Sequence, residues 1–191
     1  MCELPVFYAT TEGQTRRIAE RLAALLHERG IDSRAIDVRS PDARDVDWVA
    51  VRAVAVGASV HGGRHQQAIE AFVRANRDAL QARPSAFFSV SMRAASPCLG
   101  ERQGARQLAQ SFVNAAGWQP SHVVALAGRL AYTAYGWLTR WFIRRIAKRG
   151  GLATDTSQDH EYTDWAQVAR LADDLAASVH LASPSRDRVA S

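Results

Sequence analysis

Short apolar segments alternate with amphipathic segments along most of this chain, and this alternation limits the fold more than any other feature. Five apolar runs have the length of a buried strand, and the segments between them place apolar residues three or four positions apart, as the inner face of a helix does. Such an alternation favours a parallel sheet covered by helices on both faces. We therefore predict a doubly wound α/β domain with five parallel strands. The expected strands cover residues 4–8, 33–38, 48–57, 86–90 and 123–127, and the expected helices are one that ends at Gly30 and three over residues 66–81, 103–116 and 164–179.

The chain is predicted to form one domain, which contains one long insertion and is followed by a short tail. The length of 191 residues suits a single core, and there is no internal repeat and no linker rich in Pro, Gly or Ser. We predict a single domain over residues 1–182 and a frayed polar tail over residues 183–191. Residues 128–163 are too long for a strand-to-helix connection and rich in aromatic side chains, so we interpret them as a functional insertion before the last helix.

Composition excludes several classes of protein. Two cysteines are too few for a disulfide framework or a four-cysteine zinc site, and we expect no metal. No run approaches the 18 apolar residues of a membrane span, and the opening residues lack the basic region of a secretory signal. We therefore expect a cytoplasmic protein.

Basic residues are concentrated in one part of the chain. Residues 102–154 contain eight basic residues and no acidic one, although the net charge of the whole chain is only +5. This favours a polyanionic partner. Within it, Leu138, Trp141, Phe142 and Ile146 follow helical spacing beside the bases, which is typical of a helix at a membrane surface. A helix packed on its own domain with a solvated basic rim remains an alternative, whereas nucleic acid is disfavoured because no nucleic-acid-binding motif accompanies the charge.

Three loops follow the first, third and fourth expected strands, where ligands bind in open parallel sheets. The first, residues 10–15, has hydroxyls and a helix N-terminus that suit a phosphate, but the same residues could be a helix cap with Thr10 or Thr11 at its start. The second, residues 57–65, contains Gly62 and Gly63, which allow backbone to approach a flat ligand closely. The third covers residues 89–93. Taken alone, this third loop indicates little, because Ser and Met are equally common at the end of a strand.

The three loops carry a family resemblance. The stretches T-x-E-G-Q-T, G-A-S-x-x-x-G and F-x-S-V resemble the three FMN loops of flavodoxins. More specifically, the chain resembles the bacterial flavodoxin-like protoporphyrinogen IX dehydrogenases, which pass electrons to menaquinone. The distinctive part is the insertion, with its A-G-x-L-x-Y-x-x-Y-x-W-x-x-R stretch, G-x-x-T-D-T and Y-T-D-W. The resemblance implies a sheet order of 2-1-3-4-5. Ala9 stands where flavodoxins usually have a hydroxyl that contacts phosphate, so Thr10, Thr11 and Thr15 are expected to make more of that contact.

The resemblance also implies an activity and a set of site residues. The activity would be FMN-dependent oxidation of protoporphyrinogen IX to protoporphyrin IX, with menaquinone or ubiquinone as acceptor, at the inner face of the cell membrane. A flavodoxin-type electron carrier, an NAD(P)H:quinone reductase and a non-enzymatic docking domain remain alternatives, and a homo-oligomer is left open. The expected FMN-binding residues are Thr10, Thr11, Glu12, Gly13, Gln14, Thr15, Ala58, Ser59, Val60, His61, Gly62, Gly63, Ser89, Val90, Ser91, Met92, Arg93, Thr154, Asp155 and Thr156. The residues expected to contact substrate or membrane are Arg129, Tyr132, Tyr135, Trp137, Arg140, Trp141, Arg144, Arg145, Lys148 and Arg149.

Overall fold

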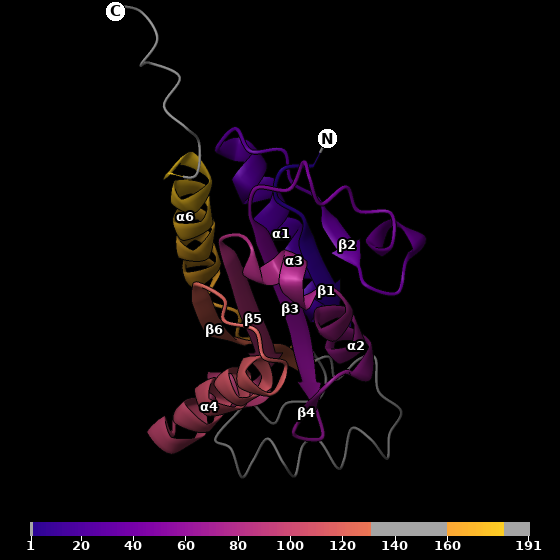
Figure 1. Ribbon diagram of the computed structural model, residues 1–191. Helices are drawn as coiled ribbons and strands as arrows, with labels where there is room; N and C mark the ends of the chain where they lie inside the picture. The colour runs from indigo at the N-terminus through magenta and orange to yellow at the C-terminus, as the bar shows by residue number, and fades with distance from the viewer. Residues whose placement is uncertain (1, 131–159, 182–191) are drawn as a thin grey trace, which may run out of the picture.

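A parallel sheet of five strands forms the centre of the molecule (Figure 1). The computed structural model describes residues 2–130 and 160–181. Across the sheet the strands run in the order β2-β1-β3-β5-β6, each parallel to its neighbours. Counted along the chain without the small antiparallel strand β4, this is the predicted order 2-1-3-4-5, which is therefore confirmed. The strands are β1 (Val6–Ala9), β2 (Ala35–Asp37), β3 (Val54–His61), β5 (Ser85–Ser91) and β6 (His122–Ala127).

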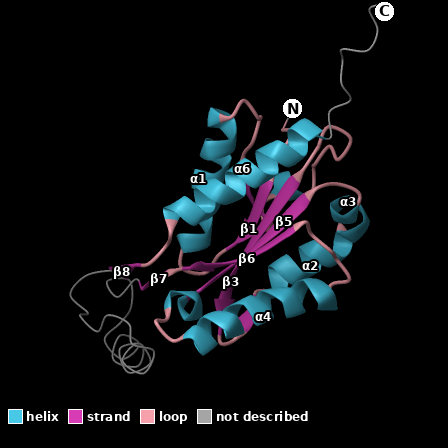
Figure 2. Ribbon diagram, turned by 90° about the vertical axis from the view of Figure 1, so that its left-hand side faces the viewer, coloured by secondary structure: helices cyan, strands magenta, loops and turns pink. Residues whose placement is uncertain are grey.

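Helices cover both faces of the sheet (Figure 2). One face carries α1 (Gln14–Glu28) and α6 (Trp165–Leu181), and the other carries α2 (Gln67–Ala75), α3 (Arg77–Gln81) and α4 (Leu99–Ala115). Successive side chains of a strand point to opposite faces, so neighbouring residues of β5 belong to different apolar layers. Phe88 packs with Leu22 and Leu175 on the α1–α6 side, whereas Phe87 packs with Trp118 on the other. The prediction of a doubly wound α/β domain is confirmed.

The third strand begins later than the sequence predicts. The expected strand over residues 48–57 starts at Val54 and continues to His61, and Trp48 lies in a turn instead. The Trp48 ring packs on Phe7 at 5.9 Å between ring centroids, and the Arg83 guanidinium lies 5.1 Å above it. The run is therefore apolar for two reasons: its second half is a buried strand, and its first half is a loop that packs on the core. Hydrophobicity alone does not show where the loop ends and the strand begins.

The helix predicted over residues 66–81 is two helices. Asn76 separates α2 from α3, with φ −112° and ψ 15°. Its side-chain Nδ2 donates to the Phe72 carbonyl at 2.9 Å, so the amide competes with the backbone for a helical acceptor, as Asn often does. The residues expected to face inward, Ile69, Phe72, Val73 and Leu80, are all buried.

A tight hairpin extends β3 beyond the sheet. Gly62 and Gly63 have φ of 57° and 78°, the left-handed values that a two-residue hairpin turn requires at both positions. The turn brings β4 (Arg64–His65) back antiparallel to the end of β3, with His61 opposite Arg64 and Val60 opposite His65. Much of the second loop expected from sequence is therefore regular hairpin, and residues 58–61 are strand.

A second short ribbon marks the two ends of the expected insertion. Strand β7 (Arg129–Leu130) pairs antiparallel with β8 (His160–Glu161). The Gly128 N–H donates to the Ser91 carbonyl at 3.3 Å, and the Tyr162 N–H donates to the Gly128 carbonyl at 3.1 Å. We call residues 128–130 and 160–163 the insertion base. The rest of the insertion and the predicted tail lie outside the described residues, so the domain limits remain a prediction.

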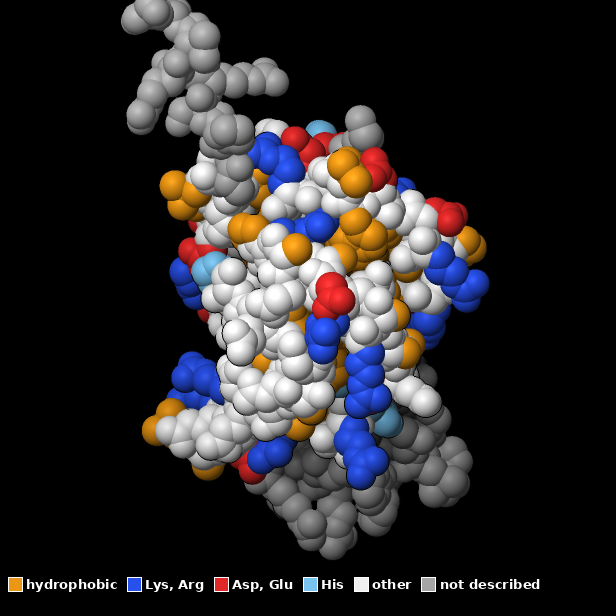
Figure 3. All heavy atoms as spheres, in the orientation of Figure 1, with side chains coloured by type: hydrophobic (Ala, Val, Ile, Leu, Met, Phe, Trp, Pro, Cys, Tyr) orange, Lys and Arg blue, Asp and Glu red, His pale blue; other side chains and the backbone are white. Residues whose placement is uncertain are grey.

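Few large hydrophobic side chains are exposed in the described part of the chain. On the face shown in Figure 3, hydrophobic side chains form small groups among polar and charged ones. Among the described residues, Val49, Leu99 and Leu181 are the large hydrophobic side chains that are exposed, and they lie on different elements. No helix in residues 2–130 or 160–181 is both long and apolar enough to cross a membrane.

Gly57 is the point where the sheet is most sensitive to an added methyl group. A Cβ at Gly57 would lie 2.0 Å from the buried Phe88 ring. We expect Gly57→Ala to lower the free energy of unfolding by about 2 kcal/mol, the usual cost of overpacking a core. Urea denaturation measures this. Gly100→Ala is the matched control, because a Cβ there would meet only the Cys98 Sγ, at 3.9 Å. Equal stability of the two variants would contradict the argument.

Candidate cofactor site

The candidate site lies at the carboxyl ends of the parallel strands. Strands β1, β3 and β5 are adjacent and parallel, so the segments that follow them meet at one edge of the sheet. These segments are the first loop, the β3–β4 hairpin, and a third segment made of the end of β5 from Ser89 onward and the short 3-10 helix Met92–Ala95. The three sequence-predicted loops are therefore brought to one place.

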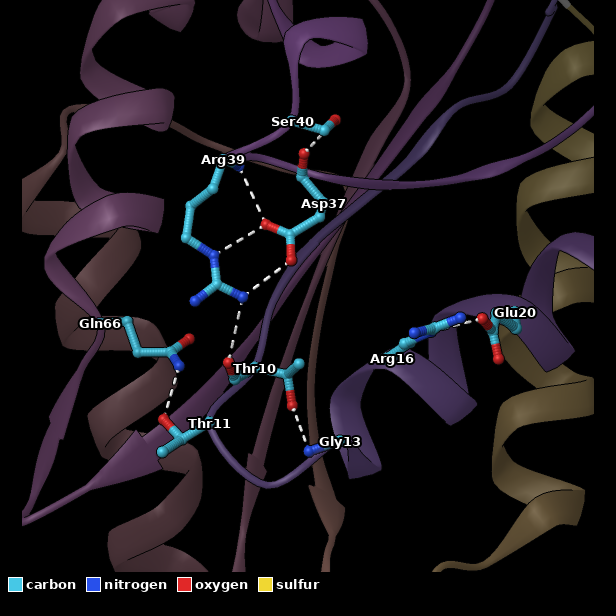
Figure 4. A network of polar contacts seen from close by, with 9 residues as sticks. All are labelled: Thr10, Thr11, Gly13, Arg16, Glu20, Asp37, Arg39, Ser40 and Gln66. Atoms are coloured by element: carbon cyan, nitrogen blue, oxygen red, sulfur yellow. Dashed lines mark hydrogen bonds and ion pairs between the residues drawn. The ribbon is translucent and has the colours of Figure 1, made fainter.

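The first loop is held in shape by the Thr10 side chain and by Gln66, which lies between β4 and α2. Gly13, with φ 87°, directly precedes α1, and its N–H donates to the Thr10 Oγ1 at 2.9 Å. The Gln66 Nε2 donates to the Thr11 Oγ1 at 2.7 Å, which links this loop to the start of α2 (Figure 4). The alternative of a Thr10 or Thr11 helix cap is wrong, since Gly13 occupies the capping position without a side-chain cap.

A network outside the loop supports it from the neighbouring strand. The Arg39 Nη2 donates to the Thr10 carbonyl at 3.3 Å, and the same guanidinium is held by Asp37 through Nε at 2.9 Å and Nη2 at 2.7 Å (Figure 4). The hydrogen bond from Arg39 holds the pKa of Asp37 below its usual value, so the pair stays ionised at neutral pH. The sequence analysis missed Arg39, although its place just after the second strand put it at the same edge of the sheet.

Two buried hydroxyls at this edge suit a phosphate or another polar ligand. Among the described residues, the Thr15 Oγ1 and the Ser59 Oγ are buried and have no hydrogen-bond partner. Thr15 itself is fully buried in the first turn of α1. Unpaired buried hydroxyls are costly and rare, and the first N–H groups of a helix have no intrahelical acceptor. The residues present therefore fit a bound anion such as the phosphate of FMN.

His65 joins the second and third segments. Its Nε2 lies 2.8 Å from the Ser89 Oγ, and its ring packs on Phe112 at 4.7 Å and on Phe87 at 5.4 Å between centroids. Burial lowers the pKa of His65 to about 4, so the ring is neutral at physiological pH. Within the described ranges, no group of three His, Cys, Asp or Glu side chains could hold a metal ion.

Residues of the third segment already have protein partners. Val90 is buried in the core, and Ser89 is bonded to His65. The Arg93 Nε pairs with the Glu101 Oε2 at 2.6 Å, so its guanidinium lies along α4. The Met92 sulfur would lie 3.5 Å from a Cβ at Gly128, which places this side chain against the insertion base.

The Gln14 side chain does not line the first loop as expected. It is 6% exposed and turned toward the insertion base, where its Nε2 donates to the Thr163 Oγ1 at 2.8 Å and to the Glu161 Oε1 at 3.0 Å. At the first loop, Gln14 therefore offers only its backbone, as the first residue of α1. Sequence reasoning missed Glu161 and Thr163, although Thr163 belongs to the Y-T-D-W stretch that carried the resemblance.

Comparison with known proteins gives the family. A family model described as a flavodoxin domain matches residues 5–157. The chain belongs to this family. Membership agrees with the fold and with FMN, the cofactor that the resemblance of the three loops implies. Among solved structures, a short-chain flavodoxin associated with a non-canonical PDU bacterial microcompartment is similar to this flavodoxin domain, with a TM-score of 0.56 at 14% identity, covering 96% of this chain and 100% of that one.

Curated relatives of this flavodoxin domain share one description. "Protoporphyrinogen IX dehydrogenase [quinone]" of Escherichia coli K12 is 35% identical over 171 residues, which cover 90% of this chain and 93% of the relative. The protein of the same description from Leishmania major is 33% identical over 184 residues, covering 96% of this chain and 78% of the relative. Both similarities extend over nearly the whole flavodoxin domain, and the predicted resemblance is confirmed.

Among the residues expected to contact substrate or membrane, Arg129 is described: it lies in β7, opposite Glu161 in the ribbon register. The other predicted residues of the insertion lie outside the part that the structure describes. They are Tyr132, Tyr135, Trp137, Arg140, Trp141, Arg144, Arg145, Lys148, Arg149, Thr154, Asp155 and Thr156.

Proposed function

We propose that this flavodoxin domain is an FMN-dependent dehydrogenase that oxidises protoporphyrinogen IX to protoporphyrin IX and passes the electrons to a quinone. The observation that carries the proposal is the 35% identity to the Escherichia coli protein of this description across 90% of the chain. The site supports it independently, because the sheet edge holds buried hydroxyls without partners among the described residues.

Residues of the first loop would bind the phosphate end of FMN. The N–H groups at the start of α1 and the Thr15 hydroxyl would donate to the phosphate oxygens, and the positive end of the helix dipole would favour the anion. The Arg39–Asp37 pair would keep the loop in this shape through the Thr10 carbonyl. Prearranged donors lose less entropy on binding than mobile ones do, which favours affinity.

Residues of the second and third segments would hold the ring system. The His65–Ser89 contact ties the β3–β4 hairpin to β5, so backbone groups of both segments keep a constant separation. Since Ser89 and Arg93 have protein partners, we propose that these segments contact the ring through backbone groups and through His61 and Met92. FMN, when bound, accepts two electrons from a donor and passes them to an acceptor.

The overall reaction needs three two-electron rounds. Protoporphyrinogen IX loses six electrons and six protons to become protoporphyrin IX, and three quinones take them up to become three quinols. We propose that the bases and aromatic residues of the insertion bind the propionate groups and flat face of the tetrapyrrole, and that the same bases attract an anionic membrane surface. We further propose that the protein works at the cytoplasmic face of that membrane.

An anaerobic assay tests the activity. Purified protein loaded with FMN is mixed with protoporphyrinogen IX and a menaquinone analogue, and formation of protoporphyrin IX is followed by its fluorescence. We expect turnover that requires both the quinone and FMN. Reduction of the quinone by NAD(P)H, with no oxidation of the porphyrinogen, would instead show a quinone reductase.

A charge variant tests the membrane contact. We expect exchange of Arg144, Arg145, Lys148 and Arg149 for Gln to weaken binding to anionic vesicles, because each base near such a surface contributes about 1 kcal/mol. Co-sedimentation with vesicles at low and high salt measures this, and FMN content should not change. The control exchanges Arg16, Arg21, Arg34 and Arg74, exposed bases outside the insertion, for Gln. Equal vesicle binding by the two variants would contradict the proposed role of the insertion.

A further inference from the structure

A buried polar network joins the first turn of α1 to the insertion base. The Gln14 Nε2 donates to the Thr163 Oγ1 at 2.8 Å, and the Thr163 Oγ1 donates in turn to the Ala127 carbonyl at 2.9 Å, at the end of β6. Gln14 and Thr163 are 6% and 9% exposed. The contact joins residues 149 positions apart in the chain.

The orientation of both side chains follows from their partners. The Arg17 Nη1 lies 3.3 Å from the Gln14 Oε1, and because a guanidinium only donates, the amide oxygen must face Arg17. The amide nitrogen then faces Thr163 and Glu161. The Thr163 hydroxyl has one proton, which goes to the Ala127 carbonyl, so its oxygen is left to accept from Gln14. The arrangement is fully satisfied and has one consistent set of donors and acceptors.

Glu161 closes the network at its partly exposed end. Its Oε1 accepts from the Gln14 Nε2 at 3.0 Å, and its Oε2 pairs with the Arg17 Nη1 at 3.3 Å. Gln14 and Arg17, three residues apart at the start of α1, are therefore held by the same carboxylate on β8. The residue next to Gln14 is Thr15, whose buried hydroxyl has no partner among the described residues.

We propose that Gln14 and Thr163 are positioning residues for the cofactor phosphate. They hold the first turn of α1, with its free N–H groups and the Thr15 hydroxyl, against the insertion base, so that the phosphate-binding groups are in place before the cofactor arrives. Neither side chain touches the phosphate. The inference rests on the proposed use of FMN and adds a mechanical link between the cofactor loop and the ends of the insertion.

The link makes the two regions thermodynamically dependent on each other. If the insertion base stabilises the phosphate-binding form of the α1 turn, bound phosphate must stabilise the insertion base by the same free energy. A flavin without phosphate gains nothing from this turn. The affinity ratio of FMN to riboflavin therefore reports the network, whereas a general loss of stability would change the two affinities together.

Two nearly isosteric substitutions remove the central hydrogen bond from either side. Thr163→Val and Gln14→Leu are each expected to raise the Kd of apoprotein for FMN about tenfold and to leave the Kd for riboflavin unchanged, as measured by quenching of flavin fluorescence. Thr163→Ser keeps the hydroxyl and should restore FMN affinity. Because both substitutions remove the Gln14–Thr163 bond, the double variant should raise the Kd for FMN by less than the product of the two single effects.

Controls separate this inference from the proposed function. Gln110→Leu removes a similar amide bond, from Gln110 Nε2 to Asn114 Oδ1 at 3.0 Å on α4, and should change neither affinity. If the buried variants do not fold, Glu161→Gln tests the partly exposed end, where about a threefold rise in the Kd for FMN is expected. Parallel changes for FMN and riboflavin, or none, would overturn the inference while wild-type protein still binds FMN. Failure of the wild-type protein to bind FMN would overturn the proposed function as well.

Discussion

Replacing Thr15 by Val is expected to weaken binding of FMN ten- to hundredfold. The side chain keeps its shape but loses the hydroxyl, and a buried oxygen of the phosphate would then lack a donor, at a cost of about 1–3 kcal/mol. Thr15 is fully buried, and its Oγ1 has no partner within the described residues, so the substitution breaks no described protein hydrogen bond. Titration of apoprotein with FMN, followed by fluorescence quenching, measures the change.

Two comparisons make the Thr15 result specific. Riboflavin, which has no phosphate, should bind Thr15→Val as it binds the wild type. Ser178→Ala is the protein control, since that hydroxyl donates within its own helix, at 2.9 Å to the Asp174 carbonyl on α6. Unchanged FMN affinity in Thr15→Val would remove this hydroxyl from the phosphate site and would assign the phosphate to another part of the edge.

The stability of the folded protein is expected to fall between pH 6.5 and pH 4 because of His65. Burial lowers its pKa in the folded state from the ordinary 6.5 to about 4. In this window the unfolded chain binds a proton that the folded chain does not, so acid favours unfolding. The contribution is fully present above pH 6.5, is lost as the pH falls toward 4, and amounts to about 3 kcal/mol.

Urea denaturation at a series of pH values isolates this contribution. Carboxylates also titrate in acid, so the comparison is between wild type and His65→Gln, which keeps a polar group near Ser89 but cannot be protonated. The free energy of unfolding of the variant should depend less on pH between 6.5 and 4. The same slope in both proteins would mean that protonation of His65 does not oppose folding.

The same residue connects stability to the site. His65 holds the β3–β4 hairpin on β5 through the Ser89 hydroxyl, and its ring packs on both Phe87 and Phe112, which stack on each other. A protonated ring would carry a charge into this apolar contact. We therefore expect the second and third cofactor segments to separate before the rest of the sheet as the pH falls, and FMN release to precede global unfolding.

Local patterns were sufficient to predict the fold and to bring the three candidate loops to one edge of the sheet. The alternation of apolar runs with amphipathic segments determined the parallel sheet, because side-chain period differs between strand and helix and is visible in a few residues. The loops at residues 10–15, 57–65 and 89–93 could be placed at one edge, since parallel strands end together. Two boundaries were predicted wrongly. The third strand was started at Trp48, because an apolar loop that packs on the core looks like a strand in sequence. The helix over residues 66–81 was predicted as continuous, because the sequence does not show that the Asn76 side chain interrupts it.

Tertiary structure alone decided how the loops are held. Gln14 belongs to the predicted phosphate loop by sequence, but its side chain bonds Thr163, 149 residues away. Thr11 is held by Gln66, and Thr10 by Arg39, from other elements of the fold. Hydrogen bonds of this kind form only when the fold places two side chains that are distant in sequence at the correct separation, within a few tenths of an ångström. Periodicity in the sequence carries no information on that separation.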